Sequence, residues 1–229
     1  MRDPRRATPH PGEPRGSLGA MIVGATRVRC PGCDRETECK LVQSINTATD
    51  PAVKAQLLAG ELNVLDCACG RRTQLAATVL FHDPATDYWC QVCPGDERAM
   101  AEGDAAFRAA GAGGTQRLVP SLNALIEKVK LLDAGLEDWA IEMAKVLLLV
   151  SRASGHDGDL ERVLLFDRVD DDAIHWLLFE DDHARVMTSP ISAYTKLASR
   201  PQGQPGPREL RIDRAWAIGA VRTMIASAN

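Results

Sequence analysis

The chain has 229 residues, of which 45% are hydrophobic and 25% charged, an ordinary composition for one large or two small globular domains. Its net charge of −4 at pH 7 argues against general nucleic-acid binding, which usually needs a basic surface. The longest apolar run, residues 146–150, is far too short to cross a bilayer, and no apolar secretory signal follows the N-terminal arginines. We therefore expect a cytoplasmic protein without membrane association.

The first residues are rich in Pro, Gly and Arg and lack apolar periodicity, which predicts a disordered tail over residues 1–20. Met21 follows directly, and one interpretation is that translation starts there. Beyond it we expect a cysteine-containing unit over residues 21–95 and an α+β remainder over residues 96–229.

Alternating apolar residues predict short strands at 22–29 and 36–42, on either side of a cysteine turn. Asp50 as N-cap and Pro51 at the first helical position then predict a helix that ends at Gly60. Residues 64–66 lead into the second cysteine turn. Two further strands are expected, at residues 73–82 and 88–92, and these are expected to pair as a hairpin.

Helices dominate the next part of the chain, and strands return near its end. An Ala-rich helix is predicted at residues 97–110, a helix capped by Ser121 follows, and a longer one covers roughly residues 137–151. The remaining elements are strands at 118–119, 163–166, 174–179 and 184–187 and helices that begin at Pro190 and Arg214. This mixture favours the α+β class over an alternating βαβ arrangement.

Two cysteine clusters carry the most chemical information, Cys30-Pro31-Gly32-Cys33 and Cys67-Ala68-Cys69-Gly70. In the first, a turn brings thiolates at positions i and i+3 within about 4 Å of each other, as tetrahedral zinc requires. In the second, residues i and i+2 of an extended segment face the same way and can still chelate. Without an export signal, such cysteines are better interpreted as reduced metal ligands than as disulfides. The sequence therefore predicts one structural zinc ion, with the ligands Cys30, Cys33, Cys67 and Cys69.

The alternative is four ordinary reduced cysteines in a small core. Cys39 is the substitute ligand if the second cluster fails to close the site. Cys90 and Cys93 also have the two-residue spacing, but positions three apart on a strand point to opposite faces, which favours core cysteines. The flanking cations that would offset four thiolates are Arg29, Arg71 and Arg72.

The segments around the cysteines resemble the CpXC domain family, bacterial proteins named for a Cys-Pro-x-Cys motif. The matching stretches are Cys30-Pro31-Gly32-Cys33, Ser44-Ile45-Asn46, Asp50-Pro51, Lys54 with residues 57–63, Cys67, Cys69-Gly70 and residues 80–84, with a weaker echo to about residue 150. Family members usually carry a second Cys-x-x-Cys, which this chain shortens by one residue. The resemblance implies a zinc-ribbon-like fold, so we expect a zinc-ribbon-like β unit with an inserted helix. The patterns of the later residues predict that helices and a small antiparallel β-rich C-terminal part follow it. It implies no specific activity.

Two classes of function follow. The favoured one is a binding or scaffold module stabilised by structural zinc, with unknown protein partners, because a closed four-ligand site leaves no position for water. The alternative is an enzyme with a cleft near His82 and Asp83, between the cysteine unit and the C-terminal half. A turn capped by Asp83 is the simpler interpretation of that pair. Asn46 and Asn63 bracket the inserted helix, and we expect their amides to bond exposed backbone, with a ligand contact as the alternative.

Overall fold

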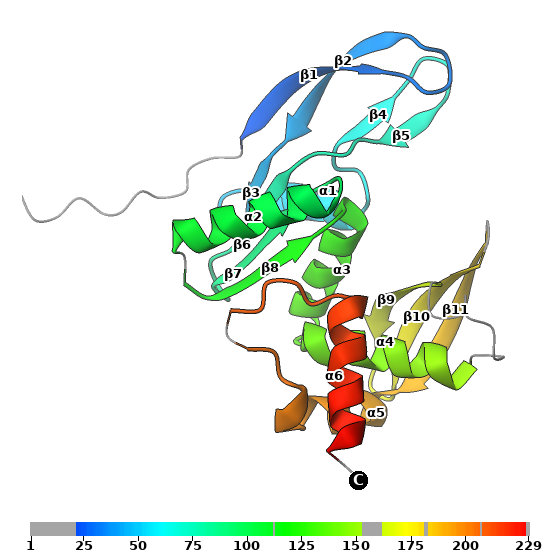
Figure 1. Ribbon diagram of the computed structural model, residues 1–229. Helices are drawn as coiled ribbons and strands as arrows, with labels where there is room; N and C mark the ends of the chain where they lie inside the picture. The colour runs from blue at the N-terminus through cyan, green and yellow to red at the C-terminus, as the bar shows by residue number, and fades with distance from the viewer. Residues whose placement is uncertain (1–21, 112, 153–161, 181–182, 207, 228–229) are drawn as a thin grey trace, which may run out of the picture.

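The computed structural model describes residues 22–111, 113–152, 162–180, 183–206 and 208–227. The predicted tail at residues 1–20 and the predicted start at Met21 lie outside these ranges. Among the described residues, six α-helices and several small sheets confirm the α+β class (Figure 1). In the same ranges, no helix combines the length and the apolarity that crossing a membrane requires.

Two β-hairpins form one end of the molecule (Figure 1). β1 (Val23–Arg29) pairs antiparallel with β2 (Glu36–Val42), and β4 (Val64–Asp66) pairs antiparallel with β5 (Arg72–Gln74). Each hairpin turn begins with a cysteine directly after the first strand. The hairpins therefore carry the two cysteine clusters at their tips.

A mixed sheet lies below the hairpins, with the strand order β3-β6-β7-β8. Its strands are β3 (Ser44–Asn46), β6 (Val79–Asp83), β7 (Tyr88–Val92) and β8 (Thr115–Val119). β6 and β7 are antiparallel, whereas the two outer pairs are parallel. Parallel pairs need crossover connections, and helices supply them.

Helices cover both faces of the mixed sheet. α1 (Pro51–Leu58) and α3 (Leu122–Asp133) pack with the face that carries Val79 and Phe81. α2 (Glu97–Ala110) packs with the other face, which carries Leu80 and Trp89. Alternate residues of β6 thus enter two different cores, as the two-residue repeat of a strand requires.

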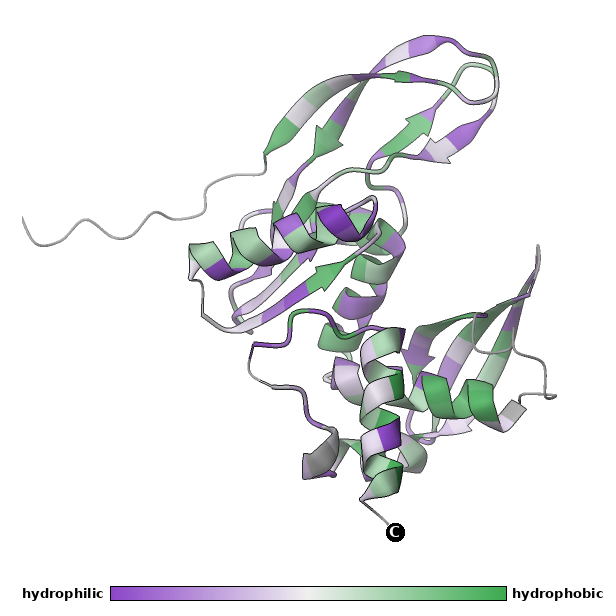
Figure 2. Cartoon of the chain, viewed as in Figure 1, coloured by the Kyte–Doolittle hydropathy of each residue, from purple (hydrophilic) through white to green (hydrophobic). Residues whose placement is uncertain are grey.

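The C-terminal part is a three-stranded antiparallel sheet with helices on one face. The strands are β9 (Val163–Val169), β10 (Ala173–Glu180) and β11 (His183–Pro190), in the order β11-β10-β9. The helical elements are α4 (Asp138–Arg152), α5 (Ile191–Ala198), the 3₁₀ turn η2 (Pro201–Gly203) and α6 (Arg214–Ala226). Its core includes Trp176 and the apolar side of α4, which is strongly hydrophobic in Figure 2.

One predicted strand was wrong. The expected strand at residues 73–82 is divided into β5 and β6, which belong to different sheets. Leu75 packs in the core between the cysteine hairpins, whereas Val79 packs under the mixed sheet. The segment between these strands crosses from one core to the other, and local sequence preferences do not show such a crossing. The predicted boundary at residue 95 stays a prediction.

Candidate metal centre

The four predicted cysteine ligands come together. Ligand atoms of Cys30, Cys33, Cys67 and Cys69 all lie within 4.8 Å of one another. The Sγ atoms of Cys30 and Cys69 are 3.7 Å apart, and those of Cys33 and Cys67 are 3.6 Å apart. A tetrahedral ion with metal–sulfur bonds of about 2.3 Å places its sulfurs about 3.8 Å apart. The spacing of the sulfurs therefore matches one tetrahedral site.

The first cysteine turn is closed by its own backbone. The N–H of Cys30 donates to the carbonyl of Arg35 at 3.0 Å, and the N–H of Asp34 donates to the carbonyl of Cys30 at 2.9 Å. Asp34 adopts a left-handed conformation with φ of 56°, which reverses the chain. The N–H of Gly32 points at Cys30 Sγ at 3.4 Å. These contacts pre-arrange the sulfur for a metal ion.

The second cysteine turn differs from the extended segment expected from the sequence. The N–H of Cys67 donates to the carbonyl of Arg71 at 2.9 Å, and the N–H of Gly70 donates to the carbonyl of Cys67 at 2.9 Å. Gly70 has a φ of 84°, which only glycine adopts readily. A hydrogen-bonded turn, rather than a strand, therefore brings Cys69 beside Cys67 despite the shortened spacing.

Gly32 lies close to the second cysteine turn. A Cβ atom at this position would lie 2.9 Å from Arg71 Cδ and 3.6 Å from Cys69 Sγ. The contact with Cys69 would be an ordinary van der Waals contact, whereas the Arg71 side chain would have to shift.

The cluster has an inner and an outer half. Cys30 and Cys67 are buried, whereas Cys33 and Cys69 are exposed. The N–H of Gly32 is the main reason that the pKa of Cys30 falls to about 7, against the opposing effect of burial. The N–H of Cys69 lowers the pKa of Cys67, but the adjacent sulfurs and burial outweigh it and raise that pKa to about 11. The hydrogen bond from Gly32 thus favours ionisation of Cys30, whereas the surroundings of Cys67 oppose it.

Two of the three flanking arginines are engaged elsewhere. Arg29 lies 3.0 Å from Glu36 across the first hairpin, and Arg72 is paired with Glu61. Arg71, which packs beside Gly32, has no ion-pair partner among the described residues.

A small core supports the two hairpins. Leu65 and Leu75 are buried with the inner cysteines, and Cys39 packs at the edge of this group. The sulfur of Cys39 contacts the carbonyl of Thr37 at 3.7 Å and is not a member of the cysteine quartet. A core of this size contributes little stability by itself.

His82 and Asp83 do not converge on one site. They are neighbours on β6, so their side chains lie on opposite faces of the sheet. The His82 ring stacks on Trp89 with ring centres 3.5 Å apart, and burial lowers its pKa. Asp83 accepts a hydrogen bond from the N–H of Ala85 at 3.0 Å, as the predicted turn cap requires.

The two asparagines bond backbone groups. Asn63 Oδ1 accepts from the N–H of Val42 at 2.8 Å, and Asn63 Nδ2 donates to the carbonyl of Val42 at 3.0 Å. Asn46 Oδ1 accepts from the N–H of Ala48 at 3.0 Å. Asn63 therefore joins the β1–β2 hairpin to the start of the second hairpin.

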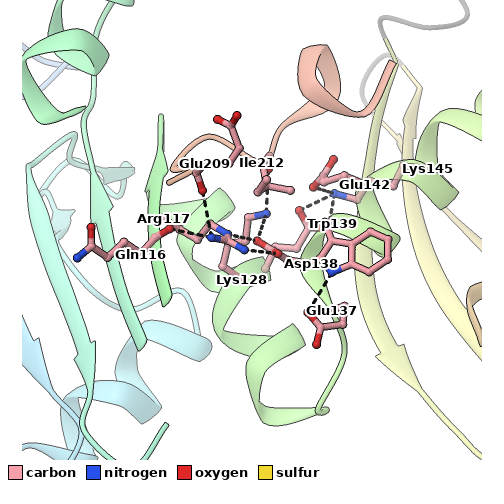
Figure 3. A network of polar contacts seen from close by, with 11 residues as sticks. Gln116, Arg117, Lys128, Glu137, Asp138, Trp139, Glu142, Lys145, Glu209 and Ile212 are labelled. Atoms are coloured by element: carbon pink, nitrogen blue, oxygen red, sulfur yellow. Dashed lines mark hydrogen bonds and ion pairs between the residues drawn. The ribbon is translucent and has the colours of Figure 1, made fainter. Parts of the chain in front are cut away.

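A buried charge network lies between the mixed sheet and the C-terminal part (Figure 3). Asp138 binds Arg117 through two hydrogen bonds, and Lys128 Nζ lies 2.8 Å from the same carboxylate. Both cations also bind the C-terminal backbone: Lys128 donates to the carbonyl of Ile212 at 2.9 Å, and Arg117 to that of Glu209 at 3.3 Å.

A second group continues the network along α3 and α4. Lys145 Nζ lies 2.8 Å from the carboxylates of both Glu127 and Glu142, and Glu127 also accepts from the N–H of Phe166 on β9. The whole network contains three cations and three carboxylates, so it is balanced in charge. In the sequence, such a network is indicated by a charged residue inside an apolar helical run, such as Lys145 between Ala144 and Val146.

Two cavities of about 330 and 490 Å³ adjoin this network, and Lys128 lines both. Neither is lined by Asn63, His82 or Asp83, the polar groups of the predicted enzyme cleft. The cations around the cavities are already bound to carboxylates and carbonyls. The junction is therefore better described as a structural joint.

Comparison with known proteins identifies the cysteine-bearing part. The family model described as CpXC protein matches residues 28–145, which is more than half of the chain and includes all four clustered cysteines. No curated protein and no solved structure matches the chain.

Proposed function

The chain belongs to the CpXC family, and on this premise we propose that its four clustered cysteines hold one structural zinc ion. We propose further that the hairpin pair fixed by this ion is a zinc-ribbon-like protein-binding or scaffold module. The partner is another protein, and the cytoplasm, where thiols stay reduced, is the proposed location.

The observation that carries this proposal is the convergence of four sulfurs from two separate hairpin turns. Four clustered soft thiolates suit zinc, because structural zinc sites almost always have four ligands in a tetrahedral arrangement. When bound, the ion would supply a crosslink between the hairpins. Four protein ligands fill its coordination shell, so it would have no position for a reacting water molecule.

Metal analysis of the full-length protein tests the site. Protein purified under reducing conditions should contain about one zinc ion per chain, as measured by inductively coupled plasma mass spectrometry. Cys33→Ser and Cys69→Ser should each lose the metal, because each removes one of the four ligands. Both residues are exposed, so their substitution leaves no core cavity that would unfold the protein. Cys39→Ser is the matched control, since Cys39 lies in the same hairpin but outside the quartet. Zinc-free wild-type protein, or equal zinc loss in the control, would contradict the proposed site.

The role as a binding module needs a separate measurement. Tagged wild-type protein, the Cys33→Ser variant and the Cys39→Ser variant should be compared as baits for the proteins of the native lysate. A partner that is retained by the wild type and by Cys39→Ser, but not by Cys33→Ser, supports the module. Identical retention by all three would place the partner site elsewhere on the chain.

A further inference from the structure

The C-terminal part contains an apolar groove of about 590 Å³ that is remote in sequence from the cysteines. It is bordered by α4, α5 and α6 and by the ends of β10 and β11. Carbon-rich side chains make most of its wall, including Leu147, Leu148, Leu197 and Met224. The α4 side of the groove belongs to the strongly hydrophobic stretch of that helix in Figure 2. The volume is in the range of small-molecule sites in proteins, about 300–1,000 Å³.

The described lining of this groove carries charge of one sign. Its charged residues are Lys196 and Arg200, and none of the described lining residues is a carboxylate. Both are exposed and have no ion-pair partner among the described residues. Helical hydrogen bonding continues past α5, since the N–H of Arg200 donates to the carbonyl of Leu197 at 3.0 Å. Lys196 in the last turn of α5 and Arg200 just beyond the end of that helix are therefore close in the chain, and both line the groove.

A hydroxyl group adds a polar point inside the apolar wall. Ser189 is 9% exposed, and its Oγ accepts from Trp176 Nε1 at 2.9 Å. A hydroxyl group that accepts one bond still has its own proton to donate. The two cations and the Ser189 hydroxyl suit a ligand that carries acceptor oxygens. The other hydroxyl-bearing residues of the described lining are Ser151, Ser192 and Tyr194.

We propose that this groove binds an amphiphilic anion, a long-chain carboxylate whose tail lies along Leu147, Leu148 and Met224 and whose carboxylate pairs with Lys196 and Arg200. Burial of the tail supplies the affinity, because apolar area leaves water. The two cations supply the selectivity, because no carboxylate of the described lining competes for them and a cationic head group would be repelled. The proposal is independent of the metal centre.

Calorimetric titration of the full-length protein with dodecanoate tests this site, with dodecanol and dodecyltrimethylammonium as ligands that share the tail. Dodecanoate should bind with a stoichiometry of about one and at least about tenfold more tightly than dodecanol, as one charge-assisted contact implies. The double variant Lys196→Glu, Arg200→Glu should reverse the preference towards the ammonium ligand. Lys40→Glu, Arg185→Glu changes the net charge equally at exposed positions outside the groove, and it should retain the wild-type order.

Ala193→Trp fills the groove from an exposed position of α5 and should abolish binding of every ligand without lowering the zinc content. No binding of dodecanoate to the wild type would overturn the proposal. So would equal affinities for dodecanoate and dodecanol, or an unchanged preference in the Lys196→Glu, Arg200→Glu protein.

Discussion

Arg117 and Asp138 form a buried bidentate ion pair at the joint between the mixed sheet and the C-terminal part. Arg117 Nε lies 2.7 Å from Asp138 Oδ2, and Arg117 Nη2 lies 3.0 Å from Oδ1. Lys128 shares the same carboxylate, and it also bonds the carbonyl of Ile212. One carboxylate on α4 thus orients two cations that hold the C-terminal backbone.

Asp138→Asn should destabilise the protein strongly, because it leaves Arg117 and Lys128 buried without a counter-charge. Removing one partner of a buried ion pair costs about 3–5 kcal/mol in the free energy of unfolding. Urea denaturation followed by circular dichroism measures this cost. Asp104→Asn is the control: it breaks an exposed pair with Arg108 on α2 and should cost about 0.5 kcal/mol. Similar losses in the two variants would show that the buried network adds no net stability.

The stabilising effect of Asp138 should depend on pH in the acid range only. Burial by itself would raise the pKa of Asp138, but Lys128 and Arg117 together hold it well below the ordinary value. A carboxyl group whose pKa is depressed by folding stabilises the folded state fully above its unfolded pKa of about 3.9. The stability difference between wild type and Asp138→Asn should therefore be constant above about pH 5 and shrink as the pH falls below about 4. A difference that stays constant down to pH 3 would contradict this assignment.

Gly103 in α2 should resist replacement by alanine because of Cys93. A Cβ atom at Gly103 would lie 2.4 Å from Cys93 Sγ. Alanine normally stabilises a helix interior by about 1 kcal/mol relative to glycine, whereas overpacking costs about 1–3 kcal/mol. We therefore expect Gly103→Ala to destabilise the wild type and to stabilise a Cys93→Ala background. A double-mutant cycle from thermal or urea unfolding gives the coupling free energy between Gly103 and Cys93. Additive effects of the two substitutions would exclude the predicted clash.

The stability of the protein should depend on both the backbone conformation and the side-chain amide of Asn63. This residue is left-handed, with φ of 54°, and its side chain makes both bonds to Val42. Asn63→Gly keeps the left-handed backbone conformation accessible. It should lower the free energy of unfolding by about 1–3 kcal/mol through the lost hydrogen bonds. Asn63→Ala should cost about 1–2 kcal/mol more, because alanine disfavours the left-handed region. Equal stabilities of the two variants in urea denaturation would show that the conformation of Asn63 is unimportant.

The candidate site was partly predictable because its signals are local. Cys30 and Cys33 flank a turn whose closure depends on adjacent residues, and the spacing alone indicates chelation. The geometry of the second pair was not predictable in the same way. Cys67 and Cys69 approach each other through a turn that depends on the pairing of β4 with β5, and the sequence favoured an extended segment.

The sequence by itself determined most element positions, the α+β class, the family and the cysteine set, because turn residues, helix caps and apolar periodicity act between near neighbours. Tertiary structure alone decided the division of residues 73–82 between two sheets and the bond between Arg117 and Asp138. The groove beside Lys196 also exists only in the folded chain. These features depend on which distant segments pack together, and that choice is made by the whole core rather than by any one stretch of sequence.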